Sequence, residues 1–227
     1  MKKAERWLEK TLHYRFQDPE LFRQALSHRS ATSRNNERLE FLGDAVLDFV
    51  ISENLFRLRP DATEGDLSRM RALLVKDESL AALAIEIDLG NHLILGSGEM
   101  KTGGHRRESI LADAVEAILG AVFLDSDFGS CRTVIENLFA NRLQSLPDIK
   151  ELRDPKTRLQ EWLQSRKMAL PAYDLVASSG QDHKQQFTVS CTVAERSVTT
   201  SGEASSLRKA EQKAARKMIR LLDEKPE

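Results

Sequence analysis

The hydrophobic pattern changes its period near residue 150, and no other feature of the sequence constrains the fold as strongly. Before that point the chain repeats helix signals, including an N-cap followed by proline at Asp18-Pro19, a capping box at Thr63 and apolar stripes at helical spacing. After it, the stretches AYDLVAS, QFTVSCTV and RSVTTS are typical of three strands between two helices. We therefore expect an all-α part followed by a small α+β part.

The charge distribution divides the chain at the same place. Residues 1–146 carry 19 Lys and Arg against 23 Asp and Glu, whereas residues 154–227 carry 13 against 10. The net charge of −1 therefore hides an acidic part and a basic part. We predict a helical domain at 1–146, a polar linker at 147–153, an α-β-β-β-α domain at 154–223 and a tail at 224–227.

The sequence disfavours several classes of protein. No apolar run approaches the ~20 residues of a membrane span, and the lysines near the start are not followed by the apolar stretch of a signal peptide. Cys131 and Cys191 show no paired-cysteine motif, which disfavours a disulfide framework and a cysteine-built zinc site. We expect a cytoplasmic protein with no membrane contact and no small-molecule cofactor.

A long helix is expected from about residue 36 to residue 58, with carboxylates opposite its core face. On a helical wheel, the expected core stripe consists of Leu39, Leu42, Val46, Phe49 and Val50. The opposite face carries Glu37, Glu40, Asp44 and Asp48. Like charges four residues apart are unfavourable when nothing compensates them. Phe41 lies beside these acids and away from the core stripe, so we expect it to contact a partner surface.

A second helix, expected from about residue 106 to residue 124, repeats this arrangement. Asp113 and Glu116 share a polar stripe with Gly120, whose place within a helix costs about 1 kcal/mol relative to alanine. Such a glycine makes sense if another helix or a ligand comes close. Carboxylates without nearby Cys or His ligands favour Mg²⁺ or Mn²⁺ over Zn²⁺. The pattern alone leaves a cation site and an ordinary acidic surface both open.

The run from Asn36 to Val46, NERLEFLGDAV, resembles the signature of the ribonuclease III family, whose members cut double-stranded RNA. The stretches GDLSRMRALLV and GEMKTGGHRRESILADAVEAILGA resemble the family in order and spacing. The second part of the chain resembles a double-stranded RNA-binding domain. The resemblance covers nearly the whole chain, and it implies an all-α nuclease domain followed by an α+β RNA-binding domain.

The resemblance also implies roles for individual acids. It assigns four residues to a catalytic Mg²⁺, for which Mn²⁺ can substitute: Glu40, Asp44, Asp113 and Glu116. Asp44 and Glu116 are the implied catalytic pair, while Glu37 and Glu64 are assigned to RNA handling or support of the site. The family is homodimeric, with Phe41 at the interface. The implied products carry 5′-phosphate and 3′-hydroxyl ends with a short 3′ overhang, because each of two sites cuts one strand.

RNA contacts are expected in the second domain. The residues that match the family's RNA-binding positions are Gln160, Glu161, His183, Ser205, Ser206, Arg208 and Lys209. Duplex RNA is recognised by its shape, 2′-hydroxyls and phosphates, which suits such polar and basic groups. Two departures from the family pattern, Ala204 in place of a glycine and Leu207 in place of a basic residue, predict weaker or more salt-sensitive anchoring.

Three functions remain in competition. The first is a metal-dependent endoribonuclease that processes rRNA precursors and other structured transcripts, including mRNA and tRNA. The second is a non-catalytic regulator that binds double-stranded RNA and keeps the first domain only as a dimer scaffold, but the intact acids Glu40, Asp44, Asp113 and Glu116 count against it. The third is a DNA nuclease, which an RNA-binding domain that reads 2′-hydroxyls disfavours.

Overall fold

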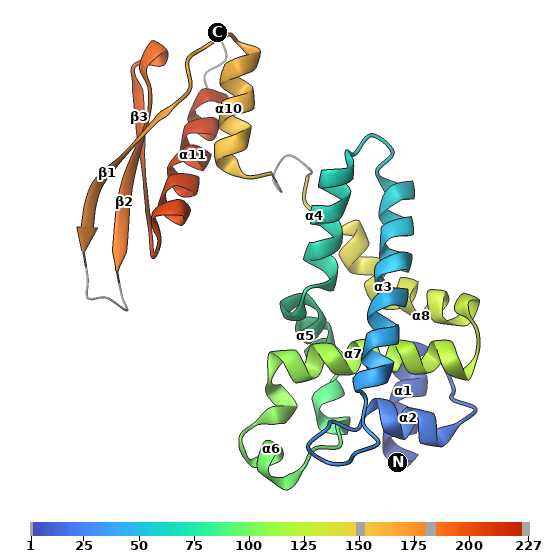
Figure 1. Cartoon of the computed structure of the whole chain (residues 1–227). Helices are drawn as coiled ribbons and strands as arrows, with labels where there is room; N and C mark the ends of the chain where they lie inside the picture. The colour runs from blue at the N-terminus through green and yellow to red at the C-terminus, as the bar shows by residue number, and fades with distance from the viewer. Residues whose placement is uncertain (1, 149–152, 180–184, 224–227) are drawn as a thin grey trace. The chain divides into compact units, whose positions relative to one another are not determined.

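The computed structural model describes residues 2–148, 153–179 and 185–223. The chain divides into two compact units, Met1–Leu146 and Pro147–Glu227, each of which is described separately below (Figure 1). His183, predicted to contact RNA, lies outside the described residues. No helix in the described part of the chain is long and apolar enough to cross a membrane.

The first unit is helical, as the sequence predicts. Its α-helices are α1 (Lys2–Leu12), α2 (Pro19–Ala25), α3 (Glu37–Leu58), α4 (Glu64–Val75), α5 (Asp77–Glu86), α6 (Ser97–Lys101), α7 (Glu108–Asp125) and α8 (Phe128–Gln144). The predicted N-caps at Asp18 and Thr63 are confirmed, because their side chains accept hydrogen bonds from the backbone N–H of Glu20 and Asp66. The glycine-rich stretch after residue 95 contains α6 and a 3₁₀ turn at Gly104–Arg106.

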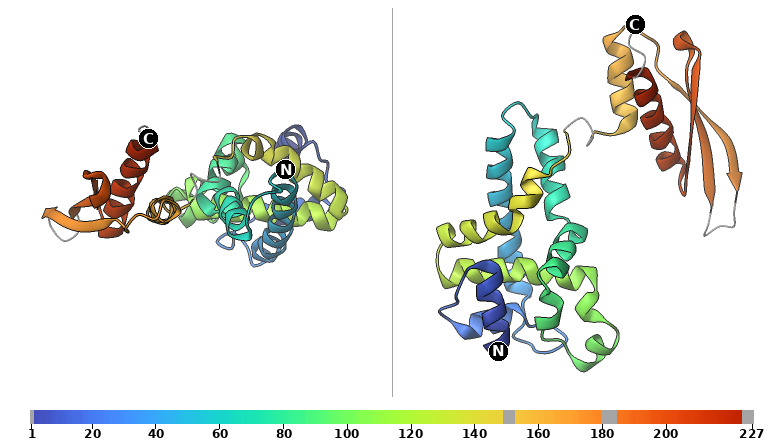
Figure 2. Two further views of the ribbon diagram at one scale, coloured as in Figure 1. Left: turned by 90° about the horizontal axis from the view of Figure 1, so that it is seen from above. Right: turned by 180° about the vertical axis from the view of Figure 1, so that it is seen from behind.

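Helix α7 forms the centre of this unit. Eleven of its residues are buried, and it packs against α2, α3, α5 and α8. Figure 2 shows α3 crossing α7, and two glycines allow this approach. A Cβ on Gly43 would lie 1.8 Å from the Glu116 carbonyl oxygen, and one on Gly120 would lie 2.1 Å from the Leu39 carbonyl oxygen. The expectation that Gly120 admits a close neighbour is confirmed, and that neighbour is a helix.

The core face of α3 differs from the predicted stripe. Leu47 and Ile51 are fully buried, whereas Phe49 is 57% exposed and makes an edge-to-face contact with Phe128 on α8, with ring centroids 5.6 Å apart. Asp48, predicted on the open acidic face, is half-buried. The reason is that α3 packs against α4 and α8 as well as α7, so its buried surface wraps further around the helix than one stripe.

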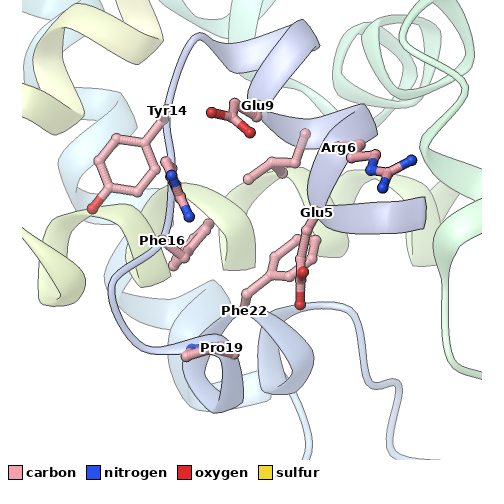
Figure 3. Close-up of a pocket in the computed structure, with 9 residues that line it drawn as sticks. Glu5, Arg6, Glu9, Tyr14, Phe16, Pro19 and Phe22 are labelled. Carbon is pink, nitrogen blue, oxygen red and sulfur yellow. The ribbon is translucent and has the colours of Figure 1, made fainter. Parts of the chain in front are cut away.

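A cavity of about 480 Å³ lies between α1 and the segment that leads into α2. Figure 3 shows Glu5 and Glu9 on α1 facing this cavity together with Phe16 and Phe22, whose stacked rings have centroids 5.2 Å apart. None of the acids expected to act in catalysis lines it.

The second unit has the order α-β-β-β-α, so the predicted fold class is confirmed. Its elements are α10 (Pro155–Ser165), β1 (Ala172–Ser179), β2 (Gln186–Val193), β3 (Val198–Ala204) and α11 (Leu207–Asp223). The strands form an antiparallel sheet in the order β1-β2-β3, in which Tyr173 pairs with Cys191 and Val189 with Gly202. Cys191 is free and buried in the core between sheet and helices, where it packs as a small apolar side chain.

Candidate active site

The crossing of α3 and α7 brings together carboxylates from both helices. Glu40 and Asp44 lie on α3, three residues before and one residue after Gly43 at the contact, while Asp113 and Glu116 lie on α7. The backbone approach fixes their relative positions, because the Gly43 Cα rests against the carbonyl of Glu116 itself. Residues more than 65 positions apart in the sequence therefore share one acidic site.

The electrostatic interactions among these carboxylates are unfavourable when all are ionised. Burial, followed by repulsion from Asp44, Glu40 and Asp113, raises the pKa of Glu116 to about 8. The pKa of Glu40 is raised by burial and then by Asp113 and Glu37. Burial and then the charge of Asp77, at the start of α5, raise the pKa of Asp113. The cluster thus holds more negative charge than its surroundings compensate.

The carboxylates of the cluster do not converge on a single position. Within residues 2–148, 153–179 and 185–223, no three His, Cys, Asp or Glu side chains converge in the arrangement of metal ligands. In the same ranges, no Lys or Arg forms an ion pair with Glu40, Asp44, Asp113 or Glu116. The four acids are close neighbours without an ion-pair partner among the described residues, and that donor set suits a hard divalent cation.

A polar cleft of about 490 Å³ lies beside this cluster. Its lining residues include Glu37, Glu40 and Asp113 together with the cations Arg29 and Arg107. Arg29 forms an ion pair of 3.4 Å with Glu37, and its charge works against the rise in the pKa of Glu40 and Asp113. Asp44 and Glu116 do not line this cleft, which is therefore an approach to the cluster from one side.

Glu64 lies apart from the four-carboxylate cluster within one chain. It is exposed at the start of α4 and accepts a hydrogen bond of 2.8 Å from the Ser68 hydroxyl. It lines a different cavity of about 470 Å³, whose walls include Phe56 and Arg71. Phe41 is 79% exposed, so its position away from the core is confirmed.

Sequence reasoning missed the residues that surround the acids. Arg71, on α4, lies 3.7 Å from the Asp48 carboxylate and so compensates that acid from outside α3. Arg29, Glu99 and Arg107 line the cleft from loops and short elements. Glu99 and Arg107 fall within the stretch that resembles the family, but residues outside a long helix carry no periodic signal of which neighbours they face.

The expected RNA-contact residues of the second unit that the structure describes lie on its surface. Gln160 and Glu161 are exposed on α10, where Glu161 forms an ion pair of 3.3 Å with Arg153. At the start of α11, the Ser206 hydroxyl accepts a hydrogen bond from the backbone N–H of Lys209. The predicted group at this helix end is exposed or half-buried: Ser205, Ser206, Arg208 and Lys209.

The two departures from the family pattern differ in their surroundings. Ala204 is buried at the end of β3, where it packs beneath α11, whereas Leu207 is 45% exposed. Lys213 and Lys217 donate hydrogen bonds to the backbone carbonyls of Glu203 and Ser201. These two lysines therefore hold α11 to β3 in addition to carrying positive charge.

Comparison with known proteins gives consistent matches. A family model described as Ribonuclease-III-like matches residues 18–143, and one described as Double-stranded RNA binding motif matches residues 155–222. Ribonuclease 3 of Alkalilimnicola ehrlichii is 54% identical over 220 residues, covering 97% of this chain and 96% of that protein. Ribonuclease 3 of Xylella fastidiosa strain M23 is 53% identical over 215 residues, covering 95% of each.

Solved structures resemble the first unit. The crystal structure of the nuclease domain of ribonuclease III from Campylobacter jejuni is 42% identical, with a TM-score of 0.61 over 64% of this chain and 99% of that one. A second structure of the same domain concerns flexibility in a region involved in dimer formation. It is 45% identical, with a TM-score of 0.58 over 60% of this chain and 95% of that one.

Proposed function

The chain belongs to the ribonuclease III family, and from this premise we propose that it is a divalent-metal-dependent endoribonuclease that hydrolyses double-stranded RNA. The observation that carries the proposal is the group of four carboxylates at the crossing of α3 and α7, where no ion pair compensates them among the described residues. A protein keeps such a costly group of charges where a cation is needed.

The residues fit Mg²⁺, with Mn²⁺ as a substitute. Glu40, Asp44, Asp113 and Glu116 would hold the metal through oxygen atoms, which hard cations prefer. When bound, divalent ions supply activation of water and neutralisation of the phosphate. Asp44 and Glu116 are the proposed catalytic pair, and the raised pKa of Glu116, about 8, supports a place where a positive charge would be strongly stabilised.

The remaining acids act outside this group. Glu37 lines the cleft and is held by Arg29 and by the Asn35 side chain, which donates a hydrogen bond of 2.9 Å, so it is positioned for RNA handling. Glu64 lies in a separate cavity of its own chain. We propose a supporting role for Glu64 in a homodimer, where the surface of a second copy would meet that cavity.

The second unit would anchor the substrate. Gln160, Glu161, Ser205, Ser206, Arg208 and Lys209 are proposed to contact 2′-hydroxyls and phosphates of duplex RNA, and His183 is proposed to join them. Two copies of the chain, paired through a surface that includes Phe41, would each cut one strand. The expected products have 5′-phosphate and 3′-hydroxyl ends and a short 3′ overhang. Substrates of this kind include precursors of rRNA and other structured transcripts.

The deciding experiment is to incubate the whole protein with a defined RNA duplex in Mg²⁺, then map both ends of every product. Staggered cuts with 5′-phosphates that disappear in EDTA and return with Mg²⁺ or Mn²⁺ are expected. Binding of the duplex without cutting under all these conditions would instead favour the non-catalytic regulator. A matched DNA duplex, which should stay intact, tests the alternative of a DNA nuclease.

A further inference from the structure

We propose that Arg107 binds a backbone phosphate of the RNA beside the one that is cut, and that Glu99 is the positioning residue that holds Arg107 for this contact. The inference rests on the proposed function and deepens it, because it concerns how the substrate enters the acidic cleft. Both residues line that cleft together with Glu37, Glu40 and Asp113.

Glu99 is a charged side chain in an unusual environment. Its side chain is only 18% exposed, and its Oε1 atom is buried without a hydrogen-bond partner. The Nη1 atom of Arg107 lies 2.9 Å from this oxygen, in an ion pair that lacks hydrogen-bond geometry. A buried carboxylate oxygen without a hydrogen bond is costly, so the nearby guanidinium is the group that makes this position tolerable.

The backbone around Glu99 is shaped to hold its side chain there. A Cβ on Gly104 would lie 2.6 Å from the Glu99 Cγ atom and 2.8 Å from its Oε1 atom, so a side chain at residue 104 would displace the Glu99 side chain. Glu99 belongs to α6, and Gly104 begins the 3₁₀ turn that leads to Arg107. The short segment thus folds back on itself to bring Glu99 against Arg107.

Arg107 is in turn tied to the helix that carries the acids. It is the N-cap residue of α7, and its carbonyl accepts the hydrogen bond of 3.0 Å from the Leu111 N–H. Asp113 and Glu116 follow on the same helix, so the position of the Arg107 backbone is fixed relative to theirs. Glu99 then restricts the one part that remains free, which is the long side chain.

An RNA phosphate that enters the acidic cleft needs a cation such as Arg107 to offset the nearby carboxylates. RNA that approaches four carboxylates is repelled before any cation compensates them. The Arg107 side chain is 50% exposed, and a guanidinium has five N–H donors, of which the contact with Glu99 uses one side. The remaining donors of this cleft-lining arginine suit a phosphate, which arginine binds through paired N–H donors. Arg29, the other arginine of the cleft, is 72% exposed and already paired with Glu37.

The test uses the whole protein with a short RNA duplex that has one cleavage site. Arg107→Ala, Glu99→Gln and the double variant are compared with Arg106→Ala, a control that removes a neighbouring exposed arginine outside the cleft lining. kcat and KM are measured at several salt concentrations and across a Mg²⁺ titration. Because Arg107→Ala strips the counter-charge from buried Glu99, the double variant supplies the same test without that unpaired carboxylate.

Arg107→Ala should raise KM about tenfold, which corresponds to about 1.4 kcal/mol for the lost phosphate contact, and leave kcat within about threefold. The slope of log KM against log salt should fall by about one. Glu99→Gln should raise KM in the same direction but less, and the double variant should be no worse than Arg107→Ala alone. Arg106→Ala should match the parent in all these measurements.

Three results would overturn the inference. If Arg107→Ala behaves like Arg106→Ala, Arg107 does not contact a phosphate. If the effects of Arg107→Ala and Glu99→Gln on KM add in the double variant, Glu99 does not act through Arg107. A Glu99→Gln protein with normal KM and a higher Mg²⁺ requirement would assign Glu99 to the metal instead. A parent that does not cut duplex RNA at all sinks the proposed function and this inference together, which distinguishes that failure from these three.

Discussion

Gly43 on α3 and Gly120 on α7 lie opposite each other at the helix crossing, where a Cβ on Gly120 would be 3.0 Å from the Gly43 backbone nitrogen and one on Gly43 would be 2.9 Å from the Gly120 nitrogen. This reciprocal contact allows two backbones to touch. It also determines how far apart Asp44 and Glu116 lie, because each of them is within four residues of the contact.

Gly120→Ala should therefore damage both stability and the site. The added methyl group would lie 2.1 Å from the Leu39 carbonyl oxygen, so one backbone must shift. We expect the free energy of unfolding to fall by about 2–4 kcal/mol, at the upper end of overpacking effects. Urea unfolding of metal-free protein measures it. Gly98→Ala is the matched control, because nothing lies within 4 Å of its Cβ position. Equal stability of the two variants would show that the crossing is not rigid.

The sequence predicts the acidic face of each helix well, but it does not predict where the two helices touch. The periodic spacing of Glu40, Asp44, Asp113 and Glu116 indicates which residues share a helix face, and Gly120 indicates a close neighbour. No pattern in the sequence pairs Gly43 with Gly120, since that contact depends on tertiary packing. For the same reason the exposure of Phe49 was predicted wrongly, because the wheel assumes one buried stripe and α3 packs on several helices.

The metal-free protein should lose stability as pH rises. The pKa of Glu116 is raised from its usual 4.5 to about 8, so the folded state holds this proton more tightly than the unfolded chain. The resulting stability is complete below about pH 4.5 and disappears progressively up to about pH 8 and beyond. Because Glu116 is partly exposed and interacts with neighbouring carboxylates, we expect a loss of only about 1–2 kcal/mol, or roughly 2–8 °C in Tm.

Thermal unfolding in EDTA between pH 5 and pH 8.5 measures this dependence. Glu116→Gln should flatten the curve, because the amide carries no charge at any of these pH values. An unchanged pH profile in Glu116→Gln would mean that another group titrates in this range.

Phe41→Glu should weaken the proposed homodimer without unfolding the chain. The ring is 79% exposed, so its replacement removes little core packing, but a charge would be buried at an interface. Sedimentation at micromolar concentrations should show a shift toward monomer. Ile85→Glu, at a 66% exposed site on α5, is the control for adding a charge to an exposed apolar position. If Phe41→Glu sediments as the parent does, Phe41 lies outside the interface.

Removal of residues 147–227 should leave a folded unit that cuts weakly. The first unit has its own core around α7, and a solved nuclease domain with 42% identity covers 64% of this chain without the second unit. We expect cleavage only at low salt or high protein concentration, because the proposed phosphate contacts of α11 are lost. Cleavage rates from 50 to 200 mM salt provide the measurement. Equal activity of truncated and whole protein at the higher salt would show that the second unit is not the anchor.

Glu116→Gln should separate binding of RNA from its cleavage. Glutamine keeps the size and one acceptor oxygen but removes the charge that a hard cation requires. The backbone of residue 116 supports the helix crossing through its carbonyl, and the substitution leaves that contact intact. Affinity for duplex RNA should stay within about threefold of the parent, because the proposed contacts with phosphates and 2′-hydroxyls lie elsewhere.

The cleavage rate of Glu116→Gln in Mg²⁺ should fall by several orders of magnitude, since metal-assisted activation of water and phosphate supplies most of the rate. A gel-shift titration and a single-turnover assay on one duplex measure both quantities. Glu108→Gln, on an exposed acid in the first turn of α7 outside the cleft lining, is the matched control and should cut at the parental rate. Near-parental cleavage by Glu116→Gln would remove this residue from the metal site, and with it the four-carboxylate arrangement on which the proposed function depends.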